Sequence, residues 1–517
     1  MRIGLALSGG GHRATAWALG SLAALVATAA NPDVVSVSSV SGASIANGAV
    51  AKAGDFRHFD DSTDFAAAVG PTLRVTGVDG LFFPGKATRA YLLTTLGFAG
   101  LTVVAAIGVV AALIAAGRES QLVGYAVLGA VLGAGVGWTL AGLVRLPRVP
   151  LAVAGTALGG LVAWGGAALT GGLHGGGLWV ALVGLGAGWL LTAWVMLVLL
   201  SGRGKALERA LAAGLLSHPA ESRPLMLGEI ASGVNHVLCA TDLESGDQFY
   251  LAPRFLYGFR EGISTTGPAS ISLAAAVQAS AALPGAFPPS VIATGPFVRD
   301  PSISLPAPPP ERVVINDGGV YDNMADQWES GLEARLSICE SLREIQEPAE
   351  VLVVANASQG WDWRHFDATG RIGHEVLGLQ RDQGVQYDVS TARRRNQLLD
   401  RFRRSKEVGT GLVGVIVMID RVPMNLAEPF AGGHDEVAER ARKAVAFIEA
   451  QHSELDWKAM ADRNGAVATT LGPIGTATVL DLMEHAYTST MVGLYVLHGI
   501  GSLAPFPRNL YAAAMEA

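Results

Sequence analysis

The residue best placed to take part in a chemical reaction is a serine at the end of an apolar strand. The segment from Val34 to Asn47 begins with β-branched and small residues, which are typical of a buried strand, and changes at Ser41 to small residues and a helical run. A serine on such a sharp strand-to-helix turn is a nucleophile elbow, which raises its hydroxyl above the sheet edge. Ser39 and Ala43 are small enough for this turn, although the usual pattern has glycines there. Ser41 is therefore the candidate nucleophile, and a tight turn without chemistry is the alternative.

A glycine-rich loop near the N-terminus is the second candidate feature. Residues 8–14 are Ser-Gly-Gly-Gly-His-Arg-Ala, between a predicted strand at Ile3 to Leu7 and a predicted helix at Ala14 to Ala30. Backbone N–H groups converge at such a junction and can bind an anion. The ligand could be the phosphate of a dinucleotide or the alkoxide formed when Ser41 attacks an ester, or the loop could bind nothing.

The alkoxide hypothesis makes the N–H groups of Gly9, Gly10 and Gly11 an oxyanion hole. A dinucleotide site requires an acidic residue at the end of the second strand to bind the ribose. Asp33 instead precedes that strand. A P-loop would need Gly-Lys-Ser or Gly-Lys-Thr after the glycines, and this is absent.

An aspartate in a glycine turn is the third candidate feature. The predicted strand from Arg312 to Asn316 ends in Asp317-Gly318-Gly319. Open α/β sheets place their active sites at the carboxyl ends of strands. Asp317 could take the proton of Ser41 directly and return it to a leaving alcohol.

Two alternatives remain for the catalytic groups. A histidine could complete a triad, and His12 in the glycine loop is the histidine placed nearest by the sequence. Ser39 and Ser44 are rival nucleophiles, although they fall within the strand and one turn into the helix.

The composition indicates a membrane component. The chain has 517 residues, a net charge of -7, 16% charged and 50% hydrophobic residues, and a mean hydropathy of +0.37. The two cysteines, Cys239 and Cys339, exclude a disulfide framework and favour a reducing compartment. The N-terminal apolar run is short and broken by glycines, unlike a signal peptide.

The apolar residues concentrate in one long segment, residues 90–200, which holds four charged side chains. Each of its four apolar runs is long enough for a helix to cross a bilayer. Gly-x3-Gly steps within them would allow close helix packing and self-association of the protein. The runs are Leu93–Ala115, Leu122–Val144, Val149–Leu169 and Leu178–Leu200.

The basic residues that flank these runs fall on one side of the predicted membrane. The positive-inside rule therefore places both neighbouring segments in the cytoplasm. The sequence therefore predicts a multi-pass plasma (inner) membrane protein with both termini cytoplasmic. Residues 1–88 would be the first part of a catalytic domain, residues 89–203 a four-helix transmembrane insertion, and residues 204–517 the second part with C-terminal helices.

A basic segment from Thr391 to Lys406 is predicted to be an amphipathic helix. Leu398, Leu399 and Phe402 lie between its arginines. Such a helix suits either an anionic membrane surface or solvent.

Five segments together resemble the patatin-like phospholipase family. Residues 7–14 resemble its glycine-rich oxyanion loop, which ends in a basic and a small residue, and residues 39–45 resemble its elbow. Residues 279–289 are similar to its Ala-Ser-x-Ala-x-Pro-x-x-Phe-Pro-Pro segment. Residues 240–246 match a strand and turn, and residues 317–323 its Asp-Gly-Gly/Ala motif. The departures are the small residues that replace the elbow glycines and the apolar insertion.

The resemblance implies an α/β fold: a patatin-like three-layer α/β/α arrangement with a mainly parallel sheet, interrupted by a transmembrane bundle of four helices. It implies a Ser41–Asp317 dyad, supported by four further residues: Arg13, Gly42, Gly318 and Gly319.

The implied activity is that of a membrane-bound serine lipid acyl hydrolase. It would cleave membrane phospholipid or another acyl-ester lipid at the cytoplasmic face of the bilayer, without a cofactor or metal and without nucleic acid. The alternatives are a catalytically idle lipid-binding or scaffold protein, and a transporter with a patatin-like regulatory domain. The absence of acids and bases in the middle of the apolar runs argues against the transporter.

Overall fold

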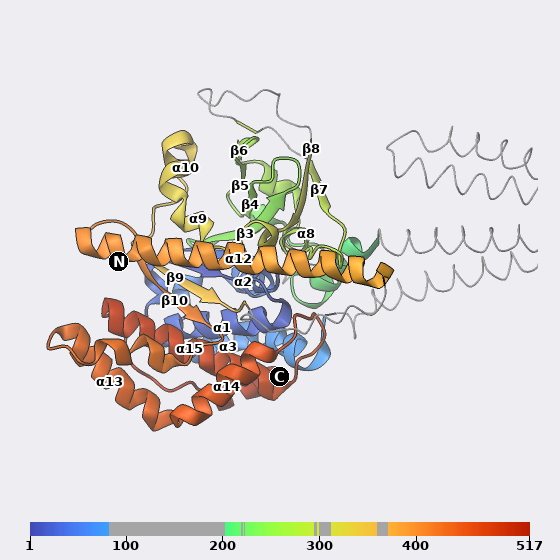
Figure 1. The fold of residues 1–517 in the computed structure, drawn as a ribbon. Helices are drawn as coiled ribbons and strands as arrows, with labels where there is room; N and C mark the ends of the chain where they lie inside the picture. The colour runs from blue at the N-terminus through green and yellow to red at the C-terminus, as the bar shows by residue number, and fades with distance from the viewer. Residues whose placement is uncertain (82–201, 219–220, 222, 294–296, 299–311, 359–370) are drawn as a thin grey trace, which may run out of the picture. The chain divides into compact units, whose positions relative to one another are not determined.

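The computed structural model describes residues 1–81, 202–218, 221, 223–293, 297–298, 312–358 and 371–517 (Figure 1). The chain divides into two units, Met1–Ala87 with Gly204–Ala517, and Thr88–Arg203. Of the second unit, only residues 202–203 belong to the described part of the chain. The structure below is therefore that of the first unit.

A ten-stranded sheet runs through this unit, in the order β10-β9-β1-β2-β3-β4-β5-β6, with β8 also paired to β3 and β7 to β8. Because β2 and β3 are neighbours, one sheet contains strands from before and after the long apolar segment. The strands are β1 Ile3–Leu7, β2 Val34–Ser39, β3 Asn235–Asp242, β4 Gln248–Ala252, β5 Phe255–Gly258, β6 Gly262–Ser264, β7 Ser290–Ala293, β8 Arg312–Asp317, β9 Val351–Asn356 and β10 Val413–Met418.

The sheet is mixed, so the prediction of a mainly parallel sheet is wrong. Strands β10, β9, β1, β2 and β3 pair in parallel, whereas β3–β4, β4–β5, β5–β6, β3–β8 and β7–β8 pair antiparallel. The reason is the length of the connections. Strands β3 to β6 follow one another through short turns, and a parallel pair needs a crossover of a dozen or more residues.

Helices cover both faces of the parallel half of the sheet (Figure 1). In β1, Ile3, Leu5 and Leu7 belong to a buried cluster with residues of α1, α3 and α15, whereas Ala6 belongs to a cluster with residues of α12. This alternation is the two-residue period of a strand buried on both faces. The helices are α1 Gly11–Ala27, α2 Gly42–Ala53, α3 Ser62–Arg74, α8 Leu273–Ser280, α9 Gln327–Ser330, α10 Leu332–Ile338, α11 Glu340–Arg343, α12 Arg371–Val408, α13 Glu436–Gln451, α14 Glu454–Ala466, α15 Thr476–His498 and α16 Arg508–Glu516.

A further helical segment covers residues 202–214. Short 3-10 or π turns lie at Asn31–Asp33, Phe56–His58, Val75–Asp79, Leu227–Glu229, Gly267–Ser270, Gly318–Val320, Pro423–Leu426 and Glu428–Phe430.

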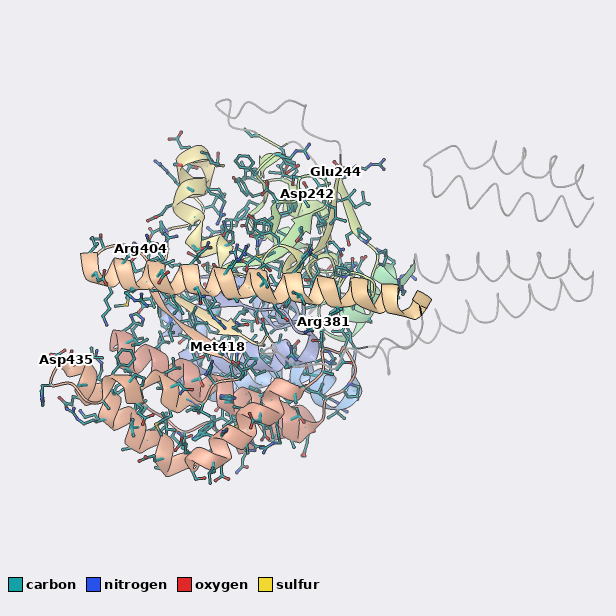
Figure 2. The ribbon with its side chains drawn as sticks, in the orientation of Figure 1. Asp242, Glu244, Arg381, Arg404, Met418 and Asp435 are labelled. Atoms are coloured by element: carbon teal, nitrogen blue, oxygen red, sulfur yellow. The ribbon has the colours of Figure 1, made fainter. Side chains whose placement is uncertain are left out.

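Helix α12 joins β9 to β10 and contains the segment predicted to be a basic amphipathic helix. It crosses the sheet on the face opposite α1 and α15 (Figure 1), with Arg381 and Arg404 toward its two ends (Figure 2). Leu398 and Phe402 pack in the buried cluster on this face. Arg394, on the same side of the helix, forms ion pairs with the loop that follows β8. One face of the predicted helix is thus part of the core.

The transmembrane part of the predicted fold class needs correction. In the described part of the chain, no helix is both long enough and apolar enough to cross a membrane. The four predicted spans and their Gly-x3-Gly steps fall in residues 82–201, outside the described residues. The same finding on the described helices contradicts the predicted location as a multi-pass membrane protein. The physical reason is that an apolar run of this length also suits burial in a protein: the 23-residue helix α15 is mostly buried against α1.

The packing of α12 gives a stability prediction. Phe402 is 7% exposed, and its ring lies where Gly414 of β10 has no side chain: a Cβ there would come within 2.7 Å of the ring. Phe402→Ala should lower the free energy of unfolding by roughly 3 kcal/mol. Leu399→Ala, at an exposed position of the same helix, should change it by less than about 0.5 kcal/mol. Urea denaturation of both variants measures the difference, and equal effects would contradict this packing.

Candidate active site

The turn between β2 and α2 holds Ser41 in a strained conformation. β2 ends at Ser39 and α2 begins at Gly42, so two residues make the whole turn. Ser41 has φ 55° and ψ −126°, a region that residues with a side chain rarely occupy. Its N–H donates to the carbonyl oxygen of Ser280 at 3.1 Å, which helps to hold the turn. This is the geometry of a nucleophile elbow, and the side chain of Ser41 remains half-buried rather than enclosed.

The first turns of α1 and α2 lie against each other next to Ser41. A Cβ on Gly42 would lie 2.0 Å from the carbonyl oxygen of Gly11, so only glycine fits there. The hydroxyl of Thr15 donates to the Gly42 carbonyl at 2.8 Å and ties the two helices together. Neither helix has a side-chain cap at its N-terminus.

The glycine loop supplies free backbone donors beside the serine. A Cβ on Gly9 would lie 3.0 Å from the Ser41 Cβ, so the loop runs directly past Ser41. The Gly9 N–H already donates to the carbonyl oxygen of Asn323 at 3.0 Å. In the described residues, the N–H groups of Gly10, Gly11 and Gly42 donate no hydrogen bond to the protein. The free donors are therefore two of the three predicted glycines together with Gly42.

Asp317 is the last residue of β8 and is 2% exposed. The Gly319 N–H donates to its Oδ1 at 2.8 Å, and the Thr241 hydroxyl donates to its carbonyl oxygen at 2.9 Å. A Cβ on Gly318 would come within 2.4 Å of the Cys239 carbonyl oxygen, so the turn needs glycine there. Strand β8 runs antiparallel to β3, but it ends opposite Ala240, toward the carboxyl end of β3. Asp317 thus lies toward the carboxyl ends of the parallel strands.

The carboxylate of Asp317 faces the hydroxyl of Ser41. Burial raises the pKa of Asp317 to about 6, and the hydrogen bond from the Gly319 N–H and the contact with the Ser41 hydroxyl partly oppose this rise. Oδ2 of Asp317 has no hydrogen bond of ordinary length and angle, so the contact with Ser41 is loose. Such contacts commonly tighten only when a substrate is bound.

The rival nucleophiles lie beneath the turn instead of at the surface. Ser39 and Ser44 are fully buried. The two hydroxyls lie 3.0 Å apart, and the Ser44 hydroxyl lies 2.8 Å from that of Ser280. Asn47 also donates to the Ser39 hydroxyl, at 2.9 Å. These contacts brace the elbow from below.

The histidine alternative finds no support in the geometry. Nδ1 of His12 lies 2.9 Å from the carbonyl oxygen of Gly472, and burial lowers the pKa of His12 to about 4. In the described part of the chain, no histidine forms a hydrogen bond with Ser41 or Asp317.

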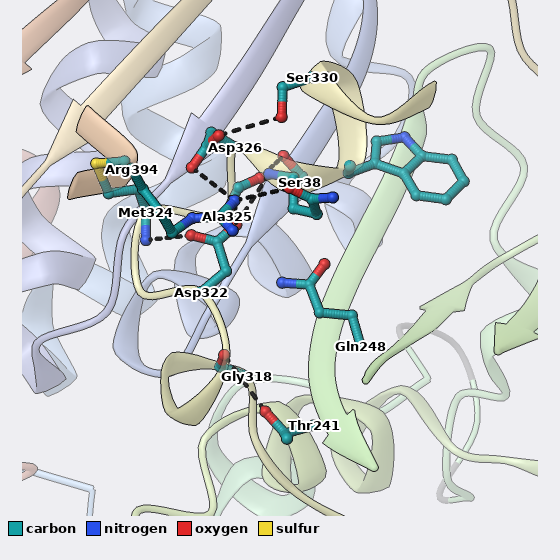
Figure 3. A network of polar contacts seen from close by, with 12 residues as sticks. Ser38, Thr241, Gln248, Gly318, Asp322, Met324, Ala325, Asp326, Ser330 and Arg394 are labelled. Carbon is teal, nitrogen blue, oxygen red and sulfur yellow. Dashed lines mark hydrogen bonds and ion pairs between the residues drawn. The ribbon is translucent and has the colours of Figure 1, made fainter. Parts of the chain in front are cut away.

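The loop after Asp317 is fixed to α12 by a buried ionic network (Figure 3). Arg394 pairs with the carboxylates of Asp322 and Asp326, each at 3.2 Å. Burial and the neighbouring Asp322 raise the pKa of Asp326 to about 7. The loop includes Ala325, with φ 58°, whose carbonyl oxygen accepts a hydrogen bond from Ser38 of β2 at 2.8 Å.

Sequence reasoning did not identify two residues near the dyad, Asn323 and Tyr387. Asn323 was inside a predicted motif but had no assigned role, whereas Tyr387 of α12 had no local signal. Tyr387 interacts electrostatically with Asp317 and with Arg13, the predicted supporting residue. Arg13 is buried, donates to the Val467 carbonyl oxygen and lies beside the glycine loop.

The dinucleotide hypothesis for the glycine loop finds no support at the end of β2. The last residue of that strand is Ser39, and not an acidic residue that could bind a ribose. In the described residues, no group of three or more histidines, cysteines or acids is placed to hold a metal ion.

Comparison with known proteins adds little to this geometry. Among solved structures, the chain is similar to VipD from Legionella pneumophila, at 14% sequence identity over 98% of this chain and 93% of that chain. The TM-score is 0.23, and so weak a likeness carries no argument about fold or function. No family model matches the sequence. No curated protein matches it either.

The raised pKa of Asp317 has a consequence for stability. Its pKa in the folded protein, about 6, lies above the value near 3.9 expected in the unfolded chain. The stability that this group contributes at low pH is therefore lost as the pH rises through about 6. Asp317→Asn removes the titration, so the melting temperature of the variant relative to wild type should be higher at pH 8 than at pH 5. A difference that is the same at both pH values would contradict a buried, raised carboxyl.

Proposed function

We propose that the protein is a serine hydrolase of carboxylic acyl esters, with Ser41 as nucleophile and Asp317 as general base. The observation that carries this proposal is the pairing of a strained serine turn with a buried carboxylate. A strained backbone of this kind persists only where its surroundings hold it, and active sites are where such strain collects. The free N–H groups of Gly10, Gly11 and Gly42 supply what an oxyanion requires.

The reaction begins when Ser41 Oγ attacks the carbonyl carbon of the ester and its proton passes to Asp317. The carbonyl oxygen becomes an alkoxide, stabilised by hydrogen bonds from the free N–H groups. When the tetrahedral intermediate collapses, the C–O bond to the alcohol breaks and Asp317 returns the proton to the departing oxygen. The acyl group is then bound to Ser41 as an ester.

Water completes the cycle by the same route in reverse. It attacks the acyl carbon and gives a proton to Asp317, a second alkoxide forms at the same N–H groups, and the bond to Ser41 Oγ breaks as that oxygen takes the proton back. The products are a carboxylic acid and the regenerated serine. The two groups suffice for the proton transfers because the same carboxylate acts first as base and then as acid.

Exposed apolar residues on the segments that carry and contact Asp317 favour an ester with an apolar acyl chain, as in a lipid. Leu283 is 45% exposed and follows Ala282, whose carbonyl oxygen accepts the Asp317 N–H at 3.4 Å. Val320 is 52% exposed and lies three residues after Asp317. Large side chains left open beside a catalytic group offer burial to an acyl chain.

The proposal predicts that Ser41→Ala and Asp317→Asn each lower the hydrolysis of p-nitrophenyl butyrate by at least about 10³-fold, because each removes a group that the chemical step requires. Both variants should keep a cooperative melting transition. Ser337→Ala, which removes an exposed hydroxyl on α10, should retain wild-type activity. Wild-type activity in Ser41→Ala would overturn the dyad. The absence of activity in the folded wild type would instead favour a binding role.

The pKa of Asp317 also predicts the pH profile of hydrolysis. Only the carboxylate can accept the proton of Ser41, so kcat/KM should fall below a pH of about 6. The profile should have slope one on its acid side and should not fall again until well above neutrality. An acid limb near pH 4 would mean that an ordinary exposed carboxyl, and not Asp317, is the base.

A further inference from the structure

We propose that Asn323 is a positioning residue of this hydrolase: its side chain holds the glycine loop against the turn of the base. The proposal rests on the proposed function and adds a residue to it. Asn323 is 6% exposed and follows Asp317 by six residues in the sequence.

The main chain of Asn323 binds the first glycine of the loop. Its carbonyl oxygen accepts the Gly9 N–H at 3.0 Å. This bond orients the peptide that precedes the free N–H groups of Gly10 and Gly11. It also explains why Gly9 itself is not a free donor.

The side-chain oxygen of Asn323 lies between two glycines. A Cβ on Gly9 would lie 2.3 Å from Oδ1, and a Cβ on Gly319 would lie 2.8 Å from the same atom. Oδ1 therefore packs against both main chains, in space that exists because neither residue has a side chain. A small change in this side chain would move the loop and the base turn relative to each other.

The side-chain nitrogen of Asn323 connects the site to a third strand end. Nδ2 donates to the hydroxyl of Ser358 at 2.8 Å, just after β9. The Ser358 N–H is held by the side chain of Asn356 at 2.9 Å, and the Ser358 hydroxyl also interacts with Tyr387 of α12. The Asn323 side chain thus links the ends of β1, β8 and β9.

A neutral amide at this position has an electrostatic consequence. The same Gly319 that packs against Asn323 Oδ1 donates its N–H to Asp317 Oδ1. A carboxylate in place of the amide would put a second negative charge beside Asp317 and beside the oxyanion. Like charges in one buried site raise a carboxyl pKa and disfavour a developing anion.

The test compares steady-state hydrolysis of p-nitrophenyl butyrate by wild type, Asn323→Asp and Asn323→Ala across pH 4 to 9. Asn323→Asp should move the acid limb of kcat/KM upward by about one pH unit and lower kcat by about tenfold or more, with KM within about twofold. Asn323→Ala should lower kcat by a similar factor without moving the acid limb. Asn396→Ala, at an exposed asparagine of α12, should match wild type in every parameter.

Ser358→Ala removes the partner of Asn323 Nδ2 from outside the site. It should lower kcat severalfold with little change in KM. The positioning role would be overturned by a folded Asn323→Asp variant with wild-type kcat and an unmoved acid limb. If Asn323→Asp does not fold, wild-type kcat in Ser358→Ala would overturn it. Ser41→Ala is measured in parallel. If it hydrolyses the ester as fast as wild type, the proposed function fails, and the positioning role fails with it.

Discussion

The close contact between the main chains of Gly11 and Gly42 is the constraint on which the site depends. There is no room for a Cβ between them, because it would lie 2.0 Å from a carbonyl oxygen. The contact sets the uncapped N-termini of α1 and α2 side by side at the sheet edge, with Ser41 at the start of α2. Free N–H groups and a strained hydroxyl are therefore brought together by backbone packing.

The second constraint is the burial of Asp317 beside that turn. One N–H and a loose contact with Ser41 oppose the desolvation of its carboxylate, so its pKa stays well above the usual value. A fully hydrogen-bonded carboxylate would be more stable and a weaker base. The rest of the sheet offsets such local costs with apolar burial on both faces, where β1 and β9 alternate between two clusters. In the proposed mechanism, this loss of stability leaves Asp317 a stronger base near neutral pH.

The parts of the site that depend on short segments could be predicted from the sequence. The strand at Ile3–Leu7 was predicted with the bounds that it has, and the turn after β2 and the turn after β8 are local patterns of strand and small residues. The parts that depend on pairing between distant segments could not. The antiparallel half of the sheet, the use of the Gly9 N–H by Asn323 and the approach of Tyr387 from α12 arise only in the folded chain. The transmembrane prediction rested on apolar length, which burial within a protein also satisfies.

We propose Ser41 as the reactive nucleophile of the candidate site. The most direct measurement is mass-spectrometric mapping of the serine that a fluorophosphonate probe modifies in the folded protein. We expect a single adduct on the peptide that contains Ser41, at the hydroxyl of that residue, and no adduct after thermal unfolding. An adduct on Ser39 or Ser44, or labelling that is unchanged in the unfolded chain, would contradict it.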